Sequence, residues 1–287
     1  MPEGWEWDET LFLGSARYYR RGRLPYAPGL PDVLAEALPL DGRGRLLDVG
    51  CGPGTLALSL THLFGDIVGV DADTGMVAEA ERRATEAGVS GRTRWVRARA
   101  EELPADLGTF TVATFGQSFH WMDRDAVAAT LKGMLGPGGA FVHISDLQTE
   151  TLSVEGLPYP AVPYAAIKEL TERYLGTVRR AGRGVLLHGT PGGEAAVLTR
   201  AGFVGFERHV VPGGQALERS CADVVAWVFS TSFSAPHLFG GRRDDFEADL
   251  GRLLREVSPA GRFSERQPST EVFVWRKPAP APGRPPA

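Results

Sequence analysis

The run from Leu46 to Gly54, Leu-Leu-Asp-Val-Gly-Cys-Gly-Pro-Gly, constrains this chain more than any other segment. It predicts a buried strand at 45–49, a turn through three alternate glycines, and a helix at 53–63. Glycine tolerates positive φ and lets a ligand approach the backbone closely. The start of the helix directs free N–H groups into the same space. A second strand at 67–70 ends in Asp71, where an acid can bind both hydroxyls of a ribose. We therefore expect a site for a nucleoside-bearing cofactor.

The spacing of the glycines separates two classes of cofactor. The sequence has G-x-G-x-G, whereas a dinucleotide pyrophosphate is held by the amides of G-x-G-x-x-G. Asp48, just before the first glycine, sits poorly beside a diphosphate and suits a ligand ammonium or hydroxyl better. A nicotinamide-dependent oxidoreductase is therefore a disfavoured alternative.

Residues 46–54 resemble motif I of the class I S-adenosylmethionine-dependent methyltransferases, and Asp71 matches the ribose-binding acid of that family. The resemblance extends over about residues 17–146. It implies S-adenosyl-L-methionine as the cofactor and S-adenosyl-L-homocysteine as its product. The cofactor contacts that we predict are Asp48, Gly50, Cys51, Gly52, Gly54, Asp71, Ala72, Met76, Ala100, Glu101, Phe115, Gln117, Tyr18, Arg23 and Tyr26.

Size and composition set broad limits. The 287 residues suffice for one α/β domain with insertions. A net charge of −4 provides no basic surface, which disfavours a nucleic-acid substrate. No apolar run approaches the roughly 20 residues that span a bilayer, and we expect no secretory signal before the fold. The two cysteines lack metal-type spacing. We expect a cytoplasmic protein without a metal or a membrane partner, and leave monomer and homodimer open.

Strand and helix patterns alternate along the first half of the chain, which predicts a doubly wound parallel sheet. The expected fold class is α/β, with a Rossmann-like, seven-stranded, mostly parallel sheet, a helical N-terminal cover and helical lid insertions. Beyond the first two strands, the core elements that we predict are strands at 93–98, 109–115 and 140–145 and helices at 74–87 and 126–135.

The alternation breaks after Asp146. The two expected closing strands, 205–211 and 271–275, are separated by some sixty residues, too many for a tight hairpin loop. We expect these residues, together with an aromatic, partly helical stretch at 158–181, to form a lid over the substrate. The predicted division is an N-terminal cover at 1–40, a cofactor-binding core at 41–147, a lid with closing strands at 148–277, and a disordered tail at 278–287.

The segment 98–104 resembles the adenine-edge motif of the same family, but Arg99 replaces its usual acid. We therefore assign the contact with the adenine amino group to Glu101 or to backbone near Ala100. Met76, five residues after Asp71, can pack on the adenine face or can be an ordinary core residue.

The segment Gln117-Ser118-Phe119-His120-Trp121 resembles a stretch found in small-molecule enzymes of the methyltransferase-11 and trans-aconitate-methyltransferase-like groups. His120 can act as a general base, because an imidazole pKa of about 6.5 suits proton removal near neutrality. It can equally fix the loop or contact the cofactor. Asp146 is the second candidate base or substrate anchor. The expected substrate contacts are Phe119, Trp121, Tyr164 and His237.

Residues 18–26 resemble an element that covers the methionine end of the cofactor in those groups, although Leu24 and Ala27 replace its prolines. An exposed arginine cluster is the alternative for this stretch. Taken together, the sequence predicts methyl transfer to an O or N, less readily a C, of a small molecule, with a specialised metabolite as the expected acceptor. A cofactor-binding protein with a regulatory or non-methylating role is the other alternative.

Overall fold

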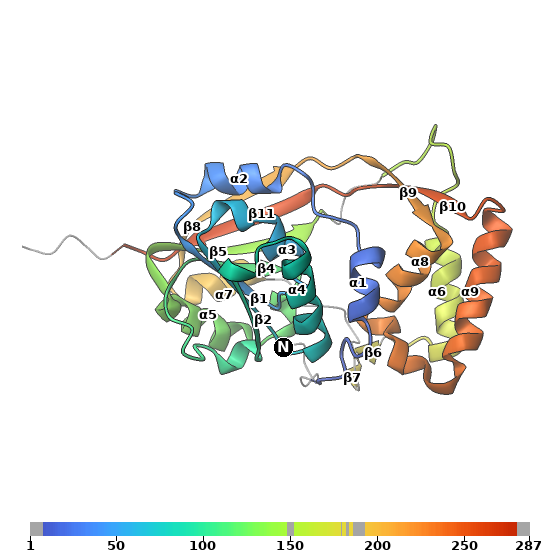
Figure 1. Cartoon of the computed structure of the whole chain (residues 1–287), viewed down its shortest axis with the longest axis horizontal. Helices are drawn as coiled ribbons and strands as arrows, with labels where there is room; N and C mark the ends of the chain where they lie inside the picture. Colours follow the sequence, from blue (N-terminus) through green and yellow to red (C-terminus); the bar gives the residue numbers. More distant parts are fainter. Residues whose placement is uncertain (1–7, 148–151, 179, 182–183, 186–192, 280–287) are drawn as a thin grey trace, which may run out of the picture.

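The computed structural model describes residues 8–147, 152–178, 180–181, 184–185 and 193–279 (Figure 1). Seven strands form one sheet in the order β3-β2-β1-β4-β5-β11-β8. The pairs from β3 to β5 are parallel, and β11 runs antiparallel to both of its neighbours. The predicted fold class is confirmed. The strands are β1 (Arg45–Val49), β2 (Asp66–Asp71), β3 (Thr93–Arg97), β4 (Phe110–Gly116), β5 (Leu135–Asp146), β8 (Val204–Val211) and β11 (Thr270–Arg276).

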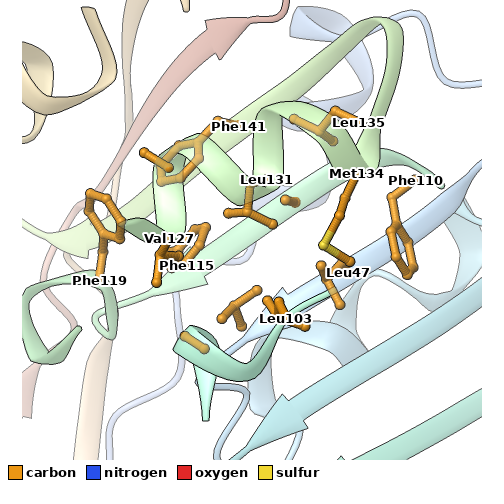
Figure 2. Close-up of a cluster of buried hydrophobic side chains, with 14 of the residues drawn as sticks. Leu47, Leu103, Phe110, Phe115, Phe119, Val127, Leu131, Met134, Leu135 and Phe141 are labelled. Atoms are coloured by element: carbon orange, nitrogen blue, oxygen red, sulfur yellow. The ribbon is translucent and has the colours of Figure 1, made fainter. Parts of the chain in front are cut away.

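The central strands are buried on both faces. Successive side chains of a strand point to opposite faces, so Leu46 and Leu47 enter two different hydrophobic clusters. Figure 2 shows the cluster of Leu47, in which Phe115 and Phe141 pack against Leu131. This two-sided burial explains the nearly continuous apolar runs of these strands. The core helices are α2 (Leu30–Ala37), α3 (Thr55–Ser59), α4 (Thr74–Glu86), α5 (Arg124–Met134) and α7 (Glu194–Arg200).

Three further helices form a separate helical unit beside the sheet (Figure 1). Its own hydrophobic cluster includes Val224, Phe229, Phe246 and Phe263. The unit joins the sheet partly through an antiparallel ribbon of β9 and β10. In the sequence these two strands lie between β8 and β11. The helical unit comprises α6 (Tyr164–Leu175), α8 (Cys221–Phe229), α9 (Arg243–Val257), β9 (Ala216–Ser220) and β10 (Arg262–Arg266).

Helix α1 (Ala16–Gly22) stands between α4 of the core and α8 of the helical unit (Figure 1). A Cβ atom at Gly22 would lie 2.4 Å from the carbonyl oxygen of Ala226. Glycine is therefore required where α1 and α8 touch. The remaining elements are the pair β6 (Arg180–Ala181) and β7 (Gly184–Val185) and 3₁₀ turns at Thr61–Leu63, Ser90–Arg92, Ala100–Glu102, Phe119–Trp121, Ser232–Ser234 and Pro236–Arg242.

None of the helices in the described ranges is long and apolar enough to cross a membrane. The predicted disordered tail lies largely outside the described residues, which end at 279.

Candidate cofactor site

The three glycines of the turn after β1 serve different purposes. All three have positive φ, between 52° and 71°. A Cβ atom would lie 2.5 Å from Ser118 at Gly50 and 2.6 Å from the Trp95 ring at Gly54, whereas at Gly52 it would meet no atom within 4 Å. Gly50 and Gly54 are thus needed for packing beneath the turn, and Gly52 leaves its outer surface open to a ligand.

Asp71 is fixed at the end of β2 by the turn itself. Its Oδ2 accepts a hydrogen bond from the Gly52 N–H (2.8 Å), and its Oδ1 accepts one from the Asp73 N–H (2.9 Å). Each carboxylate oxygen has a second lone pair for a further donor. Burial raises the pKa of Asp71 from 3.8 to about 6, opposed by these backbone hydrogen bonds. The side chain is therefore positioned to accept hydrogen bonds from two vicinal hydroxyls.

Asp48 lies behind the turn and is 1% exposed. Its Oδ1 accepts a hydrogen bond from the Thr114 hydroxyl (2.8 Å). Its Oδ2 is buried without a hydrogen-bond partner among the described residues. Burial raises the pKa of Asp48 from 3.8 to about 7, although the Thr114 hydrogen bond and, at a longer range, the Ala57 backbone N–H oppose the rise. An unpaired buried acceptor of this kind is stabilised by a cationic donor such as an ammonium group.

A cavity lies at the carboxyl ends of the parallel strands, where open α/β sheets bind their ligands. Leu11, Phe12 and Tyr19 also line it. The ring of Phe12 stands edge-on to Trp121, with centroids 6.2 Å apart, so the N-terminal segment covers the cavity. The predicted site residues that line this cavity are Gly50, Gly52, Asp71, Ala72, Met76, Ala100, Glu101, Gln117 and Trp121.

Several predicted contacts lie outside the cavity lining. Asp48, Cys51 and Phe115 are buried, and Gly54 packs beneath Trp95. The predicted substrate contact Phe119 is wrong, because its ring is 0% exposed and packs against Phe115 and Phe141 in the core. Tyr18 packs on Phe229 of the helical unit instead (5.1 Å between centroids), while Tyr19 lines the cavity. The prediction chose the wrong one of two adjacent tyrosines because a helix turns successive side chains to different faces.

Arg23 and Tyr26 lie beside the cavity rather than in its lining. The Arg23 guanidinium stands 5.1 Å from the Tyr19 ring centroid, and its Nη2 donates to the Ser230 carbonyl oxygen (2.9 Å). Burial raises the pKa of the Tyr26 hydroxyl well above 10, and the charges of Tyr19, Asp146 and Asp48 add to the rise. These groups form a polar cluster between β1, β5 and α1.

Gln117 and Asp146 join the ends of β4 and β5. The Gln117 Nε2 donates to Asp146 Oδ2 (2.8 Å), and the Gln117 backbone has a φ of 54°. Burial raises the pKa of Asp146, which the Gln117 hydrogen bond and the charge of Arg23 oppose. A positive φ is uncommon outside glycine and asparagine, and here it accompanies a side chain that lines the cavity while bonding to Asp146.

The predicted histidines lie at the edges of this arrangement. His120 belongs to the 3₁₀ turn Phe119–Trp121, and its ring centroid lies 4.9 Å from that of Trp121; it is not among the residues that line the cavity. His237 lies in a separate cleft with Leu13 and Arg243. Tyr164 lies in a groove of the helical unit. Within the described residues there is no group of three or more side chains that could hold a metal ion.

Comparison with known proteins identifies this part of the chain. Residues 46–139 match the family model described as "Methyltransferase domain". An uncharacterized methyltransferase of Mycobacterium bovis is 32% identical over 146 residues, which cover 50% of this chain and 56% of the relative. The 27-O-demethylrifamycin SV methyltransferase of Amycolatopsis mediterranei is 38% identical over 112 residues, covering 38% and 41%. The chain thus spans about half the length of the curated relatives it matches.

Among solved structures, the [4+2]-cyclase SpnF is similar with a TM-score of 0.50 and 21% identity, covering 95% of this chain and 94% of SpnF. At this identity the likeness shows the fold alone. Residues 46–139 are thus similar to a methyltransferase domain.

Proposed function

We propose that this protein transfers the methyl group of S-adenosylmethionine to an O or N nucleophile of a small molecule. The observation that carries the proposal is a pair of acids near the glycine turn, with Asp71 half-buried in the cavity wall and Asp48 buried behind the turn. Asp71 is held by the Gly52 N–H at the cavity wall, and Asp48 presents an unpaired oxygen behind the same turn. The two acids match the two polar ends of the cofactor, a ribose and an amino-acid ammonium.

The other residues of the cavity fit the rest of the cofactor. Met76 and Ala100 provide apolar contacts for an adenine ring, and Glu101 provides an acceptor for its amino group. When bound, S-adenosylmethionine supplies an already activated methyl group, so the protein's task is to orient the acceptor and exclude water. Proximity and orientation can contribute about 7–11 kcal/mol to such a step. Leu11, Phe12 and Trp121 exclude water by covering the cavity.

If the nucleophile is a hydroxyl, a base must remove its proton. Asp146 is one candidate, since it is held by Gln117 and its raised pKa makes it a better base than an exposed carboxylate. His120 is the other. Neither side chain is part of the cavity lining, but Asp146 is hydrogen-bonded to Gln117, which is, and this contact favours Asp146. A positioned base contributes roughly 10²–10⁴-fold.

The names of two relatives support a small-molecule acceptor. One is the rifamycin relative described above. The other is a ubiquinone biosynthesis O-methyltransferase of Paracidovorax citrulli, 36% identical over 118 residues. Both names describe methylation of a small molecule. We infer further that the acceptor is a specialised metabolite and that the reaction takes place in the cytoplasm. SpnF has a related fold and is a [4+2]-cyclase, so a cofactor-binding protein without methyl transfer is the second candidate.

A labelled-methyl assay separates the two candidates. The protein is incubated with S-adenosylmethionine labelled in its methyl group and a panel of hydroxyl and amine compounds, and each product is isolated. Label in an acceptor supports the proposal. Binding of the cofactor without label in any product over the whole panel would favour the non-methylating alternative.

A further inference from the structure

The helical unit contains a groove of its own, about 320 Å³ in volume, between α6 and α8. Ligand pockets for small molecules begin at about this size. Apolar side chains make up most of its wall. They include Ile167, Leu175, Trp227, Val228 and Phe233.

The polar groups of the groove are already used within the protein. The Thr171 hydroxyl donates to the Ile167 carbonyl oxygen (2.8 Å), and the Ser234 hydroxyl donates to the Val228 carbonyl oxygen (2.6 Å). Lys168 and Glu172 form an ion pair with each other (2.6 Å). A ligand therefore meets a surface without net charge and with few unused donors. Such a surface favours an uncharged, apolar molecule, because a charged one would lose its hydration without compensation.

Two hydrogen-bond chains connect one end of this groove to the border of the cofactor cavity. The Tyr164 hydroxyl donates to Glu265, which also accepts a hydrogen bond from the buried Arg219 (2.7 Å). Arg219 in turn donates to the Gly22 carbonyl oxygen (2.7 Å), at the end of α1.

The second chain starts at Trp227. Its carbonyl oxygen accepts a hydrogen bond from the Ser230 hydroxyl (2.7 Å), and the Ser230 carbonyl oxygen accepts one from Arg23 (2.9 Å). Arg23 covers Tyr19, which lines the cofactor cavity, and its charge acts on Asp146. These contacts link the end of the groove formed by Tyr164 and Trp227 to the C-terminal end of α1, beside the cavity, while the groove and the cavity share no lining residue.

We propose that this groove binds the apolar body of the methyl acceptor, an uncharged molecule that is largely aromatic or alicyclic. Its nucleophilic O or N lies at the Trp227 end, toward Arg23 and Asp146. This inference rests on the proposed function and names the substrate class for it.

The first test measures binding in the groove without methyl transfer. The probe is N-phenyl-1-naphthylamine, an uncharged aromatic dye whose fluorescence rises in apolar surroundings. Val178, 52% exposed, lines the groove, and Val257, 41% exposed, ends α9 outside its lining. We compare Val178→Arg with the matched control Val257→Arg, and check both folds by urea unfolding and by calorimetric binding of S-adenosylhomocysteine.

We expect the dye to bind the wild type and Val257→Arg equally and Val178→Arg at least about tenfold more weakly, since an arginine places an unpaired charge in an apolar site. Equal binding to both variants, or absence of dye binding to the wild type, would overturn the inference while S-adenosylhomocysteine binding keeps the proposed function intact. If Val178→Arg instead dissociates a dimer on size exclusion, the groove belongs to a second copy of the chain and the inference is wrong.

The second test concerns the acceptor itself. Labelled-methyl transfer is measured with 1-naphthol and 1-naphthylamine against glycerol and glycine. We expect label only in the two apolar compounds, competitive inhibition by the dye, and a raised KM for 1-naphthol in Val178→Arg with an unchanged KM for S-adenosylmethionine. Label in glycerol or glycine, in none of the four compounds, or equal 1-naphthol kinetics in the two variants would overturn the acceptor assignment.

Discussion

The substitution Asp48→Asn tests whether the buried acid behind the glycine turn is kept for a ligand at the expense of stability. Asparagine preserves the shape of the side chain and the acceptor that Thr114 uses. The pKa of Asp48 is about 7 in the folded protein against 3.8 for an ordinary aspartate. A group with a raised folded pKa binds more protons when folded, so its contribution to stability falls as the pH rises between the two values.

The expected magnitude follows from the two pKa values. Between about pH 5 and about pH 8, ionisation of Asp48 removes about 2–3 kcal/mol from the free energy of unfolding of the ligand-free wild type, at 1.36 kcal/mol per pKa unit. Asp48→Asn lacks this loss. We compare how much the free energy of unfolding of each protein changes between the two pH values. This comparison cancels any constant cost of burying the new amide, and it cancels the titration of Asp71, which occurs in both proteins. Urea unfolding at both pH values measures the difference.

Ligand binding should change in the opposite direction. An ammonium group interacts with the ionised carboxylate, so affinity for S-adenosylhomocysteine should rise about tenfold from about pH 6 to about pH 8 in the wild type. In Asp48→Asn the affinity should be lower, and most of the rise should disappear. Parallel unfolding curves for the two proteins over the same pH range, or unaltered affinity in the variant, would refute the reasoning about Asp48.

Three further predictions concern other parts of the site. Gly54→Ala should lower the free energy of unfolding by about 1–3 kcal/mol, because it adds a Cβ at positive φ against Trp95. The additional substitution Trp95→Leu should restore part of this lost stability in urea unfolding. If it restores none, the Trp95 ring is not the obstacle. Phe119→Ala should lower the free energy of unfolding by about 3–5 kcal/mol and leave the affinity of the folded protein for S-adenosylhomocysteine unchanged. Weaker binding in calorimetry would instead place Phe119 in the cofactor site. For His120→Gln, we expect kcat in the labelled-methyl assay to fall less than about tenfold, and a loss of 10²–10⁴-fold, the range of a general base, would restore His120 to that role.

The sequence allowed most of the sheet to be predicted because its signals are local. Buried strands of the core read as apolar runs, and each is followed by a turn or a helix start. The strand at 45–49 has the bounds that the pattern predicts. The ribbon of β9 and β10 escaped prediction. Its strands, Ala-Leu-Glu-Arg-Ser and Arg-Phe-Ser-Glu-Arg, are short and polar, and they pair with each other across a separation of forty residues or more.

The site shows the same division between local and distant signals. Gly52 and Asp71 line the cavity as the sequence predicts, because one short motif and one strand end contain them. Leu11 and Phe12 were missed, since two apolar residues near the N-terminus carry no signal for covering a cavity formed by residues 50–122. Phe119 was misassigned because an aromatic residue in a loop motif can face the cavity or the core, and only the packing against Phe141 decides between them.

The central claim is that the cavity at the end of β2 binds S-adenosylmethionine through Asp71. Calorimetric titration of S-adenosylhomocysteine and of NAD into the wild type, Asp71→Asn and the matched control Asp66→Asn tests it most directly. Asp66 is the acid at the other end of β2, 42% exposed and paired with Arg45.

We predict that S-adenosylhomocysteine binds the wild type and Asp66→Asn alike and that NAD does not bind. Asp71→Asn should bind about 10–100-fold more weakly, because hydrogen bonds to a charged group contribute about 1.5–3 kcal/mol. Binding of NAD in place of S-adenosylhomocysteine, or equal affinity in Asp71→Asn and Asp66→Asn, would contradict the claim.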